Sequence, residues 1–331
     1  MISFEKICLK SQINKWNSIV DKLNKNSISL SLCPDFGIIL SQIFNMDTEY
    51  FLIKENKIEI GVFVGLSKKN KFYSMPLLSN GGIFLFDGVE SNVKKIYNIF
   101  FSERNYNFRV KTHLRFSKFS VLNKITIYKN LPESEDLLIN SFKSKLRSQI
   151  KKAYKNGLSV KINNSDCLTN FYKIYAKGLH RLGTPVPGIS YFKKFKNNYP
   201  KDRFTIFTVY YNKKPIGTSI CFSFNDYFEV MWASTIVEFN TLNTNMILYY
   251  EMMRFAITSK NKIFSFGRSN LNSGSLRFKK QWNVKEVPIY DNYSVPTTNI
   301  NKYKFLSKIW ILLPFKLTLV LGPILRKYIV N

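Results

Sequence analysis

Residues 204–234 read FTIFTVYYNKKPIGTSICFSFNDYFEVMWAS, and this stretch decides the fold class. It contains three runs rich in aromatic and β-branched residues, the composition of strands. These runs are Phe204–Tyr211, Pro215–Phe224 and Tyr227–Ser234. The polar segments between them, Asn212-Lys213-Lys214 and Asn225-Asp226, are typical of tight turns. The stretch therefore predicts three consecutive antiparallel strands.

Helical patterns flank these strands on both sides. Apolar residues recur at helical spacing in four segments. These are Ser141–Tyr154, Leu168–Leu182, Ile189–Asn198 and Leu242–Ser259. A strand at Ile263–Phe266, a short helix at Gly274–Trp282 and a last strand at Val287–Tyr290 follow. The pattern predicts an α+β domain.

The first part of the chain shows a similar mixture of strand and helix signals. Strands are predicted at Tyr50–Lys54, Lys57–Gly65, Lys71–Ser74, Phe108–Lys111 and Val121–Tyr128, with a helix at Val89–Phe101. Because 331 residues exceed the usual size of one hydrophobic core, two domains are expected. We place them at 1–135 and 136–295, followed by an apolar tail at 296–331.

The charge balance predicts an anionic partner. Fifty Lys and Arg against 21 Asp and Glu give a net charge of +29, spread along the whole chain. Such a field attracts tRNA, a membrane surface with anionic lipid, or a substrate that carries a pyrophosphate. A Lys- and Asn-rich compositional bias is the alternative explanation, although it does not account for so few carboxylates.

Cysteine and histidine usage argues against metal or Cys/His chemistry. Cys8, Cys33, Cys167 and Cys221 show no CxxC spacing, and His113 and His180 are the two histidines. No disulfide pattern is present, so a reducing, cytoplasmic setting is expected. Glu5 and Lys6 interrupt any apolar run at the N-terminus, which does not read as a signal peptide.

The predicted helix Ser141–Tyr154 has one apolar face and a strongly basic remainder. Phe142, Leu146 and Ile150 share the apolar face, whereas Arg147 and Lys151 lie among the cations. We interpret this basic face as a candidate site for an anion or an anionic donor. A solvated cationic face is the alternative.

The segment Phe305–Val330 is strongly apolar but interrupted by Lys308, Pro314, Lys316 and Gly322-Pro323. No uninterrupted run reaches the ~18 residues that a membrane span requires. Trp310 with flanking cations suits an interfacial helix on a membrane. The alternative is a tail that docks on the protein's own surface.

Two short sequence motifs carry polar groups at positions where ligands often bind. Gly183 and Pro185 form a helix-stop signal, and Arg181 and Thr184 are candidate donors to an anion or carbonyl beside it. Further on, Phe266-Gly267-Arg268-Ser269 ends a predicted strand with a glycine, a cation and a hydroxyl.

The segment Gly274–Trp282 is the third cluster of candidate site residues. A helix here sets Phe278 and Trp282 on one face, with Lys279 beside them and Arg277 nearby. A lysine held against aromatic rings can direct its charge at a developing oxyanion. An ordinary lysine whose stem covers an apolar helix surface is the alternative.

These words, taken in order, resemble the FemAB-like aminoacyltransferase family, and in particular its branch associated with exopolysaccharide and exosortase systems. The matching words are Arg147 to Gly157, Gly183-Thr184-Pro185, Trp232-Ala233-Ser234, Asn245 with Leu248-Tyr249-Tyr250, Phe266-Gly267-Arg268-Ser269, and Phe278-Lys279 with Gln281-Trp282. The resemblance is clearest from Ser141 to Tyr290. It implies two GNAT-like domains, each a mixed, mainly antiparallel sheet flanked by helices, plus an apolar helical tail.

The resemblance also implies roles for residues. The family's Phe-Lys word places its catalytic lysine at Lys279. By hypothesis Arg268 and Ser269 bind an acceptor phosphate or carboxylate, and Glu229 and Tyr227 accept the amine proton. Further substrate-binding candidates are Arg181, Thr184, Trp232, Asn245, Arg277 and Trp282; Arg147 and Lys151 are the candidates for donor binding, and no metal is expected.

The expected activity is acyl or aminoacyl transfer that forms an amide or ester on a cell-envelope glycan or peptidoglycan-type precursor, without a covalent enzyme intermediate. The donor, aminoacyl-tRNA or an acyl thioester on CoA or a carrier protein, is a co-substrate, and no tightly bound cofactor is expected. The acceptor is an anionic lipid- or nucleotide-linked precursor of peptidoglycan or polysaccharide biosynthesis. We expect the protein in the cytoplasm, with the inner membrane surface and tRNA as candidate partners.

Two readings without turnover remain. One is a basic membrane-peripheral or RNA-binding scaffold that has a GNAT-like fold, because fold does not fix function. The other is an assembly partner that binds another enzyme of surface-polysaccharide synthesis through the apolar tail.

Overall fold

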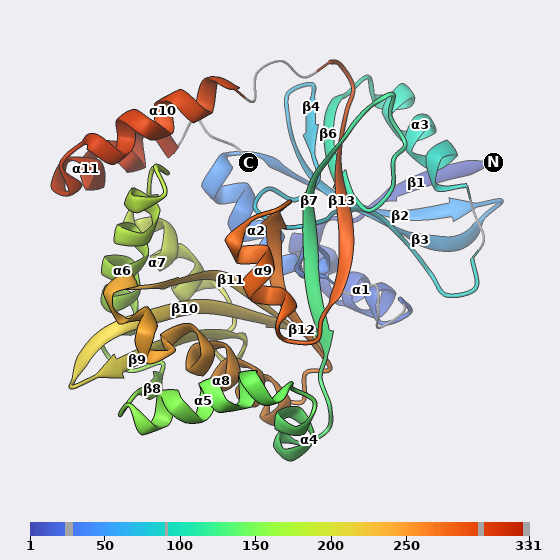
Figure 1. The fold of residues 1–331 in the computed structure, drawn as a ribbon. Helices are drawn as coiled ribbons and strands as arrows, with labels where there is room; N and C mark the ends of the chain where they lie inside the picture. Colours follow the sequence, from blue (N-terminus) through green and yellow to red (C-terminus); the bar gives the residue numbers. More distant parts are fainter. Residues whose placement is uncertain (24–28, 90–91, 297–300, 327–331) are drawn as a thin grey trace.

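The computed structural model describes residues 1–23, 29–89, 92–296 and 301–326. Figure 1 shows one long sheet that runs through the molecule, with helices on both of its faces and the α10–α11 hairpin at one side. The described strands form a single path in the order β1-β2-β3-β4-β6-β13-β7-β12-β11-β10-β9-β8, and β5 pairs with β3. The predicted fold class, mainly antiparallel sheet flanked by helices, is confirmed.

The chain repeats one order of elements twice. The first half consists of β1 (Ile2–Lys6), α1 (Leu9–Val20), α2 (Pro34–Phe44), β2 (Asp47–Glu55), β3 (Ile58–Lys68), β4 (Lys71–Tyr73), β5 (Gly82–Leu85), α3 (Val93–Arg104), β6 (Asn107–Thr112) and β7 (Phe119–Asn130). The second half consists of α4 (Glu135–Asn140), α5 (Ser144–Lys155), β8 (Ser159–Ile162), α6 (Cys167–Arg181), α7 (Ile189–Asn198), β9 (Phe204–Tyr211), β10 (Lys214–Phe224), β11 (Tyr227–Thr235), α8 (Thr244–Thr258), β12 (Ile263–Asn270), α9 (Gly274–Lys280) and β13 (Lys285–Tyr293). In each half a strand, two helices, three strands, a helix and two strands follow one another; β5, α4, α5 and α9 are additions to this repeat.

The two halves exchange their last strands. β6 pairs with β13 instead of β7, and β12 pairs with β7, while β7 and β13 pair with each other. We predicted the first domain to end at residue 135, but the strands before and after this residue belong to one continuous sheet. The domain bounds themselves stay a prediction.

Three apolar clusters hold these layers together. The central cluster joins α1 and α2 of the first half to α6 and α7 of the second, where Phe36 packs against Phe195 and Phe222. A second cluster lies under α5 and α8, and a third packs α3 onto the first half of the sheet. Because the halves share the central cluster, burial of apolar surface fixes one half against the other.

The predicted meander is confirmed to within one residue at each end. The basic helix is confirmed as α5, whose Leu146, Ile150 and Ala153 are buried. The strands and α-helices that the sequence did not predict are β1, α1, α2, β5, α4 and β8.

The tail forms two helices, α10 (Asn301–Leu312) and α11 (Phe315–Arg326), which dock on α6 and the loop after it. His180 Nε2 lies 3.0 Å from the carbonyl oxygen of Leu313. Trp310 is only 6% exposed and packs against the protein, as the alternative of a docked tail predicts for this side chain. Contact of the tail with a membrane stays a prediction. In the part of the chain that the structure describes, no helix combines the length and apolarity needed to cross a bilayer.

Candidate active site

The site begins where two parallel strands separate. β11 and β12 pair at Tyr227, Phe228 and Glu229, opposite Ile263, Phe264 and Ser265. Beyond Glu229, β11 continues along β10 up to Thr235, but its pairing with β12 ends. The backbone groups beyond this split are no longer held by the parallel ladder, and a cavity lies beside them.

A bulge in β12 turns the chain into this split. The pairing of β12 with β7 shifts register between Ser265 and Arg268. Gly267 within the bulge has φ +66, and a Cβ there would lie 3.3 Å from the Val230 carbonyl oxygen. A glycine fits this turn because the left-handed region carries no steric cost for it.

Lys279, on α9, stabilises this bulge through hydrogen bonds to its backbone. Ser273 caps α9 by accepting from the Leu276 N–H, and the helix sets the Lys279 side chain over β12. Lys279 Nζ donates to the carbonyl oxygens of Phe266 at 2.5 Å and Arg268 at 3.2 Å. Since an ammonium has three N–H donors, these bonds leave one for a ligand.

The cavity at the split has a volume of about 320 Å³. Within the described part of the chain, its charged lining consists of four cations, Lys124, Arg268, Lys279 and Arg326, and one carboxylate, Glu229. Leu77, Ser79, Tyr175, Trp232, Tyr249 and Ser275 also line it. The excess of positive charge suits an anionic ligand or a developing oxyanion.

Glu229 is buried at the bottom of the split with 3% of its surface exposed. Tyr227 Oη donates to Glu229 Oε2 at 2.9 Å. Burial raises the pKa of Glu229 to about 7, against the opposing effects of the Tyr227 hydrogen bond and the nearby Arg268 and Lys279. A carboxylate whose pKa lies near neutrality can both accept and release a proton at working pH.

Two lysines of the cavity have depressed pKa values. Burial lowers the pKa of Lys279 to about 8, while the charge of Glu229 opposes the shift. Burial and the charge of Arg268 lower the pKa of Lys124 to about 8. Perturbed groups gathered around one cavity are typical of functional sites.

The structure brings together most of the candidates from β11, β12 and α9. Glu229, Trp232, Arg268 and Lys279 all line the cavity, and Ser269 contacts the lining residue Ser275 at 3.1 Å. Arg268 also donates to the carbonyl oxygen of Leu78 at 3.2 Å, which ties the site to the first half.

The remaining candidates lie elsewhere. Arg181 and Thr184 stand at the end of α6 beside the tail and do not line the cavity. Asn245 donates to Thr235 Oγ1 at 3.1 Å, Arg277 is exposed on α9, and Trp282 is buried behind it against Tyr249 and Phe142. Arg147 and Lys151 lie on the outer face of α5, where Lys152 and Lys155 complete a basic surface.

Sequence reasoning missed Lys124, Ser79, Tyr175 and Arg326. Lys124 lies on β7, and only the exchange of β7 and β13 places it beside β12, where it is opposite Asn270. Its one sequence signal is a lysine in the middle of a predicted strand, which does not identify a distant partner. Arg326 reaches the cavity from the tail.

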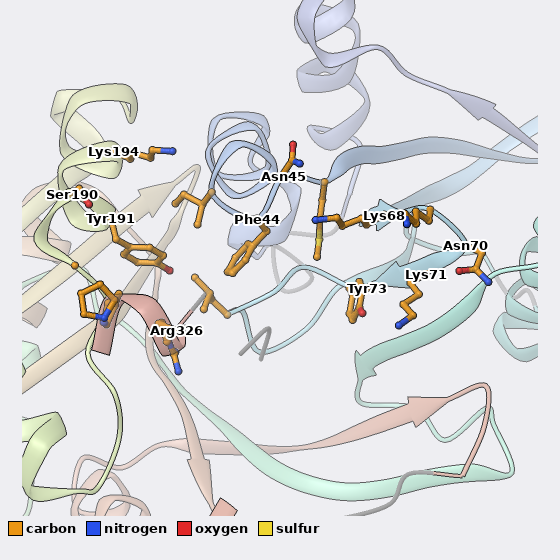
Figure 2. A pocket seen from close by; sticks show the side chains of 17 residues that line it. Phe44, Asn45, Lys68, Asn70, Lys71, Tyr73, Ser190, Tyr191, Lys194 and Arg326 are labelled. Atoms are coloured by element: carbon orange, nitrogen blue, oxygen red, sulfur yellow. The ribbon is translucent and has the colours of Figure 1, made fainter. Parts of the chain in front are cut away.

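A larger groove adjoins this cavity, with a volume of about 680 Å³. Leu77 and Arg326 line both spaces. Figure 2 shows Tyr191 and Arg326 on one side of the groove and Tyr73 and Lys71 on the other. Among the residues that the structure describes, its cations are Lys68, Lys69, Lys71, Lys194 and Arg326, its apolar residues include Phe44 and Met46, and its lining contains no Asp or Glu.

Comparison with known proteins agrees with this architecture. The chain matches the crystal structure of FemX with a TM-score of 0.66 at 15% identity, covering 92% of this chain and 100% of that one. It also matches a tandem GNAT protein from the clavulanic acid biosynthesis pathway with a TM-score of 0.54 at 7% identity, covering 90% and 100%. These likenesses define the class of fold as two GNAT-like units in one chain.

Sequence comparison narrows the class. A sequence model of the FemAB family matches residues 105–215. A UDP-N-acetylmuramoylpentapeptide-lysine N(6)-alanyltransferase of Weissella viridescens is 25% identical over 170 residues, which are 50% of this chain and 50% of that enzyme. The chain is thus FemAB-like, as the motifs predicted; its placement in the exopolysaccharide-associated branch stays a prediction.

Proposed function

We propose that this protein is a FemAB-type aminoacyltransferase that forms an amide on a peptidoglycan-type precursor of the cell envelope, with aminoacyl-tRNA as the donor. The observation that carries the proposal is the joint placement of Glu229, Arg268 and Lys279 at the β11–β12 split. The named activity of the Weissella relative supports the choice of reaction class.

The groove beside the cavity suits the acceptor. Its lysines and Arg326 present several donors to phosphate oxygens, and its apolar residues can cover the uncharged part of a ligand. Because groove and cavity share Leu77 and Arg326, an acceptor bound in the groove can extend its amine into the cavity. A nucleotide- or lipid-linked pyrophosphate fits this arrangement.

The proposed chemistry is direct attack of the acceptor amine on the ester carbonyl of the donor. The amine nitrogen bonds to the carbonyl carbon and loses a proton to the Glu229 carboxylate. The carbon–oxygen bond to the ribose then breaks, and the leaving oxygen takes up a proton. Lys279 stabilises the oxyanion with its remaining N–H, and no covalent enzyme intermediate is required.

The donor is proposed from the relatives and from charge. The cations of α5, the half-buried Arg147 and the exposed Lys151 and Lys155 among them, form a surface that can neutralise phosphates of tRNA. An acyl thioester is the alternative donor, and it makes no use of this surface.

The test is mass spectrometry of acceptor precursors after incubation with wild type or Lys279→Ala. Each protein receives pooled aminoacyl-tRNA in one reaction and pooled acyl-CoA in another. We expect a mass increase of one aminoacyl group with wild type and aminoacyl-tRNA, reduced about 10²- to 10³-fold in Lys279→Ala, the loss typical of one missing oxyanion donor.

Lys280→Ala is the matched control, because Lys280 is the neighbouring lysine of α9 but is exposed and pairs with Glu286 at 3.0 Å. It should retain wild-type activity. Product with acyl-CoA alone would replace the donor in the proposal. No product from wild type with either donor would favour the scaffold reading.

A further inference from the structure

The α10–α11 hairpin has two unlike sides. Its inner side packs on the protein through Trp310, Thr318 and Gly322, which are buried. The contact is close, since a Cβ on Gly322 would lie 2.6 Å from the Val186 carbonyl oxygen. The hairpin is therefore fixed to the body of the protein.

The outer side of the hairpin is apolar and open. On α10, Leu306, Ile309 and Leu312 are exposed at a spacing of three residues, and Leu312 is 82% exposed. On α11, Leu317, Val320 and Ile324 are exposed at spacings of three and four, and Val320 is 63% exposed. Both spacings set the residues along one helix face. We call these six residues the outer stripe.

Cations flank the outer stripe on both helices. Lys308 of α10 and Lys316 of α11 are exposed next to it. The sequence from 301 to 331 contains Lys and Arg but no Asp or Glu. An apolar face bordered by cations, on helices of 12 residues each, has the pattern of helices that lie in a membrane surface.

We propose that the outer stripe of α10 and α11 binds the surface of an anionic lipid bilayer. The apolar side chains enter the boundary between headgroups and acyl chains, while Lys308 and Lys316 contact anionic headgroups. Charge favours this occupant over a second copy of the chain, because two stripes face to face bring together like charges on two proteins of net charge +29.

The stripe is coupled to the groove by its place in the fold. Pro323 and Arg326 of α11 line the groove, one turn from the exposed Val320 and Ile324. A hairpin seated on a bilayer therefore holds the groove close to the membrane surface. This second step rests on the proposed function, because it says that the acceptor reaches the groove as a lipid-linked molecule.

The binding test needs no activity. Full-length protein is sedimented with vesicles of phosphatidylcholine alone or of equal parts phosphatidylcholine and phosphatidylglycerol. We expect binding to the anionic vesicles that weakens at high salt. The variant Leu312→Ser/Val320→Ser/Ile324→Ser should bind at least about tenfold more weakly, because it removes three inserted side chains.

Matched controls separate this site from general stickiness and general charge. Ile58→Ser/Leu137→Ser/Ile162→Ser removes three exposed apolar side chains elsewhere and should bind like wild type. Lys308→Glu/Lys316→Glu should weaken binding to anionic vesicles by about tenfold or more, whereas Lys94→Glu/Lys95→Glu on α3 has a much smaller effect. Circular dichroism verifies that each variant is folded.

Two outcomes overturn the proposal. One is vesicle binding that the stripe variant leaves unchanged, or no binding at all. The other is a dimer in sedimentation equilibrium that the stripe variant dissociates, since the stripe is then a subunit interface. If vesicle binding is confirmed but wild type forms no product with either donor, the proposed activity fails and the bilayer site stands.

Discussion

Each half of the molecule contains a split between two parallel strands, and the two splits differ in what occupies them. In the first half β4 pairs with β6 over three residues, as β11 does with β12. The chain after Tyr73 then stays on β6, where Ser74 N–H bonds Arg109 O and Gly81 N–H bonds Lys111 O. The Lys111 amine donates to Leu78 O at 3.0 Å and closes this split from within.

The second split lacks that closure. β11 continues past Glu229 along β10 without following β12, and Arg268 and Lys279 border the space that opens. The helix α9 carries Lys279, whereas the described residues 113–118, between β6 and β7, form no helix. The split in the first half is thus filled by the protein's own chain, whereas the split in the second half forms the candidate active site. The loop that fills the first split also lines this site, through Leu77 and Ser79.

The largest expected effect is a difference in kcat/KM between variants of the two buried lysines, Lys279 and Lys111. Lys279→Met should lower kcat/KM about 10²- to 10³-fold, because it removes the cation proposed to stabilise the oxyanion. Lys111→Met should lower it less than about tenfold, a loss confined to the support of Leu78. Steady-state kinetics of both variants at one pH measures the contrast, and equal losses would mean that the two splits share one chemical role.

The next effect concerns Glu229, for which the first half has Tyr73 at the corresponding register position. Activity should rise with pH through about 7 as Glu229 ionises, and fall above about 8 as Lys279 loses its proton. Glu229→Gln should lower kcat about 10²-fold and lose the rise near pH 7. A retained rise in this variant would assign it to another group.

The same substitution, which should lower activity, should raise the stability of the fold at high pH. The folded pKa of Glu229 lies above its usual value of 4.5, so the protonated form favours the fold and stability is lost as pH rises towards about 7. At pH 8, Glu229→Gln should exceed wild type in unfolding free energy by up to about 3 kcal/mol; at pH 4 they should agree. Urea unfolding at the two pH values tests this, and a difference that does not change with pH would contradict the shifted pKa.

The smallest effect concerns α5, the basic helix that precedes β8 in the second half. Lys151→Glu/Lys155→Glu should weaken binding of aminoacyl-tRNA by about tenfold and flatten its dependence on salt. The control Lys94→Glu/Lys95→Glu on α3 reverses two charges on the first half. Filter binding over a salt series measures both, and equal losses would make the effect one of total charge.

Local sequence patterns predicted the part of the site that lies on elements close to one another in the sequence. The turns at Asn212 and Asn225 located β9 to β11, and the words around Arg268 and Lys279 located β12 and α9. The exchange of β7 and β13 was beyond reach, because alternation within a strand does not depend on which strand lies beside it. Lys124 was missed for the same reason, and Arg326 because the pattern of a helix does not show where that helix docks. The helix α1 was missed because its Lys, Ser and Asn residues obscure the apolar face around Trp16.

The exchanged strands also set the order in which the protein can be completed. During synthesis β6 emerges long before β13, the strand that must lie beside it, so the edge of the first half stays uncovered until β13 has also left the ribosome. Contacts this distant in sequence slow folding and leave strand edges open to wrong pairing. A chain truncated before Lys285 therefore loses a neighbour of both β6 and β7, and its first 130 residues are not expected to fold as an independent product.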